Sequence, residues 1–136
     1  MTALSAHEAL IYMMVTMSAA DRRMSPDELE RIGEIVRRFP VFHSYDSNRL
    51  VKTAESCGDM LSAGAGLSAV LDMVVEALPA KLRETAYAIA VEVAAADLRV
   101  TNEEIRVLEL LRHALGLDKL VTAAIERGAR ARAQTL

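Results

Sequence analysis

The chain has little cysteine and few aromatic residues. Cys57 is its one cysteine, tryptophan is absent, and three tyrosines and two phenylalanines are the only aromatic residues among 136. A single cysteine excludes an internal disulfide and any metal site built from several thiolates, and it suits a reducing compartment. Alanine, leucine, methionine, glutamate and arginine, all strong helix formers, dominate instead. Composition therefore favours an all-α protein.

A strong excess of charge and a long apolar run are also lacking. The net charge is −3, which gives no general attraction to nucleic acid or to anionic lipid. The basic cluster Arg127, Arg130 and Arg132 suits the C-terminal end of a helix, where the helix dipole favours cations. The apolar run at residues 10–15 is too short to span a membrane, and charged residues flank it, so it does not resemble a signal peptide. We therefore expect a cytoplasmic protein with no direct membrane insertion and no nucleic-acid partner.

Capping and apolar patterns predict one all-α domain over residues 1–136, a bundle of about seven helices. Helix starts are marked by three capping boxes, in which Ser5, Ser25 and Thr101 each precede a glutamate by three residues. Apolar residues surround the helices expected at 6–20 and 86–96, so these two should be central. Residues 41–45 are the segment expected to form an exposed loop. The other helices should carry apolar stripes at Leu29, Ile32, Val36 and Phe39; at Leu50, Ala54, Cys57 and Leu61; at Leu67, Val70, Leu71, Val74 and Leu78; at Ile105, Leu108, Leu111 and Leu115; and at Leu120, Val121, Ala124 and Ile125.

One phrase occurs twice in the chain. Residues 19–29 and 95–105 align at a displacement of 76, with identical Ala, Asp, Arg and Glu and with exchanges within one chemical type of Met for Val, Ser for Thr, Asp for Glu and Leu for Ile. A duplicated unit explains this match better than chance. The repeat predicts a pseudo-twofold bundle with half-repeats at residues 1–64 and 65–136. We call residues 19–29 the first acidic corner and residues 95–105 the second.

Each acidic corner offers three carboxylates within eight residues. Carboxylate oxygens are the ligands that hard divalent cations prefer, and a negative patch can also dock a basic partner. A third interpretation needs no ligand, because aspartate and glutamate in a turn before a helix also bind backbone N–H groups. The candidate metal ligands are Asp21, Asp27 and Glu28 in the first corner and Asp97, Glu103 and Glu104 in the second.

Other motifs point to no catalytic chemistry. Residues 64–69 match the glycine pattern of dinucleotide-binding turns, but helix rather than strand is expected before them. The three histidines lie far apart in sequence, and only His43, in the expected loop, is a candidate for chemistry. Cys57 falls on an apolar stripe and is expected in the core. We therefore expect a protein that is not an enzyme.

The repeated phrase in an all-helical chain of this length resembles the TerB-like tellurite-resistance family and the related helical domain of DjlA-type co-chaperones. The resemblance implies a cytoplasmic seven-helix bundle of a stress response, with its acidic clusters engaged in metal-ion sensing or in assembly with membrane-associated protein partners. It places the family's acidic positions on the six carboxylates named above. The family usually has glycine after the first aspartate of each corner, where this chain has Arg22 and Leu98. Direct capture of the tellurite anion is not expected of an acidic chain with one cysteine.

Overall fold

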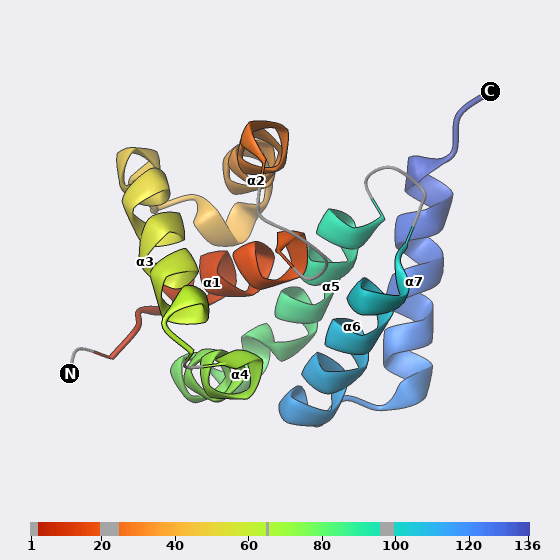
Figure 1. Cartoon of the computed structure of the whole chain (residues 1–136). Coiled ribbons are helices and arrows are strands. Elements are labelled where there is room, and N and C mark those ends of the chain that lie inside the picture. The colour runs from red at the N-terminus through yellow and green to blue at the C-terminus, as the bar shows by residue number, and fades with distance from the viewer. Residues whose placement is uncertain (1–2, 20–24, 65, 96–99) are drawn as a thin grey trace.

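The structure is a computed structural model of the chain that describes residues 3–19, 25–64, 66–95 and 100–136. Helices and connecting segments account for all of this described part, without strands, so the prediction of an all-α bundle is confirmed (Figure 1). None of the described helices is long and apolar enough to cross a membrane. The α-helices are α1 (Ala6–Ser18), α2 (Pro26–Arg38), α3 (Leu50–Ser62), α4 (Gly66–Ala77), α5 (Arg83–Ala94), α6 (Asn102–Leu115) and α7 (Lys119–Ala133), and the 3-10 helices are η1 (Pro40–Phe42), η2 (Ser47–Arg49) and η3 (Ala80–Leu82).

Capping boxes start α1, α2 and α6 as predicted. In each, the backbone N–H of the cap residue donates to the glutamate three residues on, and the glutamate N–H donates back to the cap hydroxyl. Pro26 is the first residue of α2, where its missing N–H costs nothing. The starts of α2 and α6 are thus displaced by the same 76 residues as the repeated phrase, while the pseudo-twofold relation of the two halves stays a prediction.

The core lies around α1 and α5. All residues of α1 from Ala9 to Ser18 are buried, and α1 packs against α3, α4 and α5 (Figure 1). Helix α5 packs in turn against α6 and α7. Because both helices are enclosed by neighbours, an apolar surface that continues around each of them is stable there. The prediction that these two helices are central is confirmed, although α5 begins at Arg83, earlier than the expected residue 86.

The expectation of an exposed loop at residues 41–45 is wrong for its aromatic residues. Phe42 ends η1 and is only 3% exposed, whereas His43 is exposed as predicted. The His7 ring of α1 stacks on Phe42 at a centroid distance of 5.6 Å and lies 5.3 Å from the ring of Tyr45. His7 Nε2 also donates a hydrogen bond of 2.7 Å to the carbonyl oxygen of Val41. These contacts hold the segment against the first turn of α1.

Three predicted stripe residues lie at the surface. Ile105 is 43% exposed, Leu120 is 79% exposed, and Ala124 is exposed as well. Ile105 and Leu120 occupy the first turns of their helices, where the packing against neighbours is incomplete. Helix α7 buries Thr122 and Ala129, and Leu120, two residues before Thr122, points about 200° around the helix from it. The sequence had placed the inner face of α7 one position too early.

Candidate functional site

The described carboxylates of the acidic corners divide into two kinds. Glu28 and Glu104 close capping boxes: Glu28 Oε1 accepts from the Ser25 N–H at 3.0 Å, and Glu104 Oε1 accepts from the Thr101 N–H at 2.9 Å. Asp27 and Glu103 are exposed in the first turns of α2 and α6, where the helix dipole favours negative charge. Folding thus accounts for the position of each of these four carboxylates.

The other candidate ligands lie outside the described residues. Asp21 and Asp97 belong to segments 20–24 and 96–99, as do Arg22 and Leu98. Within the part of the chain that the structure describes, no three histidine, cysteine, aspartate or glutamate side chains gather closely enough to hold a metal ion. A site shared by the two corners therefore stays a prediction.

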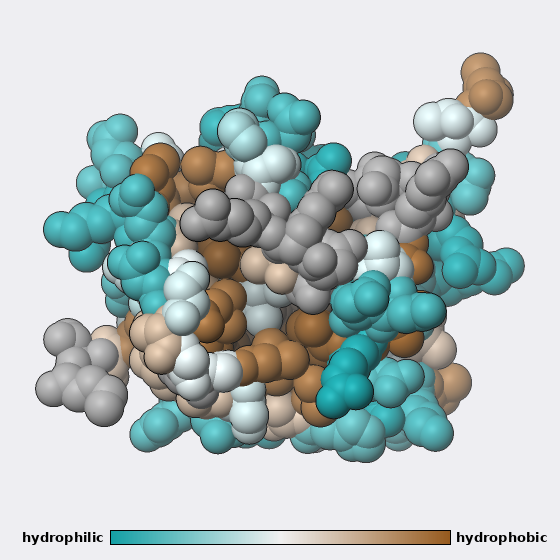
Figure 2. Space-filling model, in the orientation of Figure 1, coloured by the Kyte–Doolittle hydropathy of each residue, from teal (hydrophilic) through white to brown (hydrophobic). Residues whose placement is uncertain are grey.

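One groove borders the first acidic corner and the helix that begins in the second. Ala19 and Leu29 of the first corner line it, and Val107 of α6, two residues after the second corner, lines it as well. We call it the corner groove; its volume is about 970 Å³. In Figure 2, hydrophobic surface is visible between α3 and α6. The described lining residues are Val15, Thr16, Ala19, Leu29, Val51, Ala54, Glu55, Gly58, Asp59, Leu61, Ser62, Leu67 and Val107.

The corner groove is apolar with acidic groups along one wall. Val51, Glu55 and Asp59 succeed one another at four-residue spacing on α3, and Val51 is 52% exposed. Among the described lining residues, Glu55 and Asp59 are the acidic ones, and neither carboxylate has an ion pair or a hydrogen bond there. Like charges four residues apart on a helix destabilise it by about 0.2–0.5 kcal/mol. A cationic group placed between them would relieve this repulsion.

A smaller pocket of about 340 Å³ lies between α5, α6 and α7. Exposed Val100 and Ile105 line it together with Tyr87, which is 2% exposed. The Tyr87 hydroxyl donates to Glu126 Oε2 at 2.5 Å, and burial, aided by this carboxylate, raises the pKa of Tyr87 well above its usual value. Sequence reasoning missed this bond, since the residues are 39 positions apart and neither belongs to a motif.

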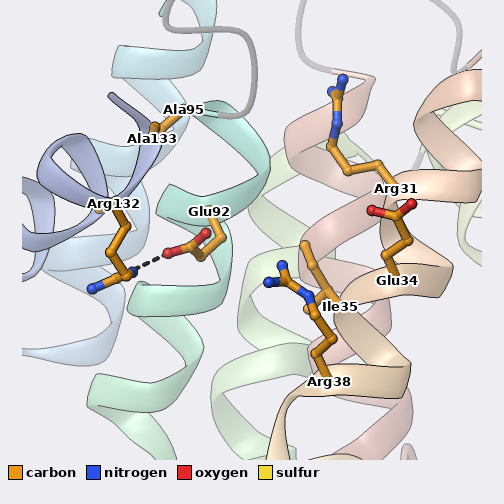
Figure 3. Close-up of a pocket in the computed structure, with 9 residues that line it drawn as sticks. Arg31, Glu34, Ile35, Arg38, Glu92, Ala95, Arg132 and Ala133 are labelled. Atoms are coloured by element: carbon orange, nitrogen blue, oxygen red, sulfur yellow. Dashed lines mark hydrogen bonds and ion pairs between the residues drawn. The ribbon is translucent and has the colours of Figure 1, made fainter. Parts of the chain in front are cut away.

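A third cleft, of about 320 Å³, is lined by arginines. Arg31 and Arg38 line it from α2, while Arg132 of α7 pairs with Glu92 of α5 across from them (Figure 3). The sequence showed Arg132 only as part of a C-terminal cluster and gave no sign that α2 adds two more arginines. The Arg132 side chain is 62% exposed, and an exposed ion pair contributes about 0–1 kcal/mol. Glu34 also lines this cleft, so its charge is mixed.

The lone thiol is a core group, as expected. Cys57 has no exposed surface, and its thiol lies 3.5 Å from the carbonyl oxygen of Tyr12 and 3.9 Å from the hydroxyl of Thr16. Burial raises the pKa of Cys57 to about 11, so the thiol is protonated at neutral pH. A protonated, enclosed thiol is a poor nucleophile and a poor metal ligand.

Comparison with known proteins identifies one family. The family model described as tellurite resistance protein TerB matches residues 7–127, which include the described parts of both acidic corners and all the described residues that line the corner groove. Searches of curated proteins and of solved structures found no significant match.

Proposed function

Because the chain belongs to the TerB family of tellurite resistance proteins, we propose that it is a non-enzymatic protein of a cytoplasmic stress response that docks a protein partner at the corner groove. One observation carries this proposal: the groove is lined from both α2 and α6, the helices that begin in the two acidic corners. The helices that begin in the two copies of the repeated phrase therefore both contribute to one apolar surface. Two such helices that line a single groove are suited to one shared binding role.

The non-enzymatic part of the proposal is supported by the state of the nucleophilic and basic groups. Cys57 is enclosed and protonated, and His7 is held by the carbonyl oxygen of Val41. His43 is exposed beside the end of α2, in a cleft with Arg37 and Arg38. General base catalysis by a histidine usually relies on a hydrogen-bonded partner that orients the ring.

Cation binding by the acidic corners is the finer hypothesis. Asp27 and Glu103 are exposed, and Asp21 and Asp97 precede them in the chain, so a divalent ion could tie the docked partner to these carboxylates. Calcium, magnesium, manganese and zinc titrations of the thermal midpoint test this hypothesis. A midpoint that rises with one ion, and no longer rises after Asp21→Asn with Asp97→Asn, supports it. If none of the four ions changes the thermal midpoint, the cation-binding hypothesis is wrong and the proposal of partner docking remains.

Growth under tellurite tests the docking proposal itself. A strain that lacks the chain's own gene is complemented with the wild type, with a Val51→Asp variant of the groove, or with a Leu120→Asp control. Both substituted side chains are exposed, Val51 at 52% and Leu120 at 79%, so both variants should fold. We expect the control to protect cells like the wild type and Val51→Asp to fail. Equal protection by the two variants would contradict the proposal.

A further inference from the structure

The shape and charge of the corner groove narrow the class of partner. Its α3 wall runs from Val51 to Ser62, a length of about 16 Å at 1.5 Å per residue, which matches about three turns of a helix laid alongside. The half-buried Leu29, Leu61 and Leu67 offer apolar contacts from three different helices. A groove between helices of this kind is suited to an amphipathic helix that inserts apolar residues at i, i+3, i+4 and i+7.

The charge of the groove determines which charge the polar face of that helix should carry. Glu55 and Asp59 lie on the α3 wall, and Asp27 and Glu103 are exposed at the starts of the two helices that provide Leu29 and Val107. All four are negative, whereas the arginines of the third cleft line a separate site. Negative charge beside an apolar groove disfavours anionic lipid and nucleic acid and favours a basic segment.

We propose that the corner groove binds a basic amphipathic helix of a partner protein, with apolar residues in the groove and lysine or arginine against Glu55 and Asp59. The inference rests on the proposed docking function and adds the chemistry of the partner. Glu55 and Asp59 lack a cation within the described chain, so the helix would supply one that the fold does not.

A pair of synthetic peptides tests the proposal. The first is a 14-residue amphipathic peptide of leucine and lysine, and the second has glutamate in place of each lysine. Binding to the whole chain is measured by fluorescence anisotropy at low and at physiological salt. We expect the lysine peptide to bind more tightly than the glutamate peptide by at least about tenfold, with an affinity that falls as salt rises. Equal affinity for the two peptides would overturn the proposal.

Two variants of the chain locate the binding. Glu55→Gln with Asp59→Asn removes the charges of the groove, and the matched control Asp72→Asn with Glu76→Gln removes the same charges at the same spacing on the exposed face of α4. The groove variant should bind the lysine peptide about tenfold more weakly, and the control should bind like the wild type. A loss of the same size in both variants would show general attraction to an acidic protein and would contradict the proposal.

Gly58 allows the groove to be blocked without harm to the fold. A Cβ atom at Gly58 meets no other atom within 4 Å, and the residue lines the groove from α3. The Gly58→Met variant should therefore fold normally and fill part of the groove, so its affinity for the lysine peptide should fall by at least about tenfold. The control Ala114→Met, on the exposed face of α6, should bind the peptide like the wild type. Unchanged binding by Gly58→Met would contradict the proposal.

Two further outcomes separate the helix proposal from the docking function. If Val51→Asp fails to protect cells while the lysine peptide does not bind, the partner is not a basic helix but the docking function stands. If the chain alone forms a dimer in sedimentation experiments and Gly58→Met abolishes it, the occupant is a second copy, and the basic-helix proposal is overturned.

Discussion

Tyr87 of α5 and Glu126 of α7 are joined by a hydrogen bond of 2.5 Å between the tyrosine hydroxyl and a carboxylate oxygen. The tyrosine ring is 2% exposed, whereas Glu126 lies at the surface. The bond thus ties the last helix to a central helix of the bundle. A hydrogen bond to an ionised acceptor stabilises more than one between neutral groups.

Tyr87→Phe should lower the free energy of unfolding by about 1–2 kcal/mol, because it removes this bond and keeps the shape of the ring. Tyr45→Phe is the matched control, since the Tyr45 hydroxyl lies 3.4 Å from that of Thr53, a long and weak contact. Its expected loss is smaller, about 0.5 kcal/mol or less. Urea denaturation of the three proteins measures both values. Equal losses in the two variants would show that the bond to Glu126 contributes no more to the free energy of unfolding than the weak contact of Tyr45.

The thiol of Cys57 should make stability depend on alkaline pH. Burial raises its pKa from 9.0 to about 11 in the folded chain. Between these values the unfolded thiol loses its proton and the folded thiol keeps it, so the free energy of unfolding falls as pH rises through this window and is unaffected below it. Between pH 8 and pH 10 the wild type should lose about 1 kcal/mol more than Cys57→Ala.

The cavity that alanine leaves is the same at both pH values, so its contribution cancels in this comparison. Denaturant titrations of the two proteins at pH 8 and pH 10 give the four free energies required. Parallel pH profiles would contradict the assignment of a protonated, buried thiol.

Substitutions in the capping boxes of α2 and α6 should lower the stability of the chain to different degrees. Ser25→Ala and Thr101→Ala remove the hydroxyl that accepts from the N–H of Glu28 and Glu104, and each should cost about 1 kcal/mol. Glu28→Gln and Glu104→Gln should cost less, because glutamine also closes a capping box. Thermal unfolding measures all four. If the glutamine variants keep wild-type stability but lose partner binding, these carboxylates serve a partner rather than the cap.

Replacement by alanine should change the free energy of unfolding in opposite directions at two glycines. Gly58 lies within α3 with open space at its Cβ position, so Gly58→Ala should raise the free energy of unfolding by up to about 1 kcal/mol through helix propensity. Gly64 has a φ of 84°, which an L side chain rarely adopts, and Gly64→Ala should lower it by about 1 kcal/mol. Urea denaturation measures both changes. A loss in Gly58→Ala would mean that this face of α3 is more crowded than the structure shows.

Local features of the fold could be predicted from the sequence. Serine, threonine and glutamate three residues apart mark helix starts wherever they occur, so Ser5, Ser25 and Thr101 were placed correctly. The uninterrupted apolar run of α1 likewise required a central position. Both signals are contained within about one or two turns of chain, and their meaning does not depend on distant residues.

Features that depend on distant partners could not be predicted. Phe42 looked like a loop residue because the contact that buries it comes from His7, 35 positions earlier. Periodicity identifies an apolar face but not how far along a helix its neighbour extends, so Ile105 and Leu120 were assigned to the core. The corner groove was missed for the same reason: Leu29 was predicted only as a stripe position and Val107 was given no role, because only the fold brings the two residues to one surface.

The most direct test of the account is a map of amide chemical-shift changes when the leucine–lysine peptide is added to the isotopically labelled chain. We predict the largest changes along the α3 wall of the corner groove, from Val51 to Ser62, and at Leu29, Leu67 and Val107, which line the groove from other helices. Changes centred on Arg31, Arg38 and Arg132 of the arginine cleft, or spread evenly over the surface, would contradict it.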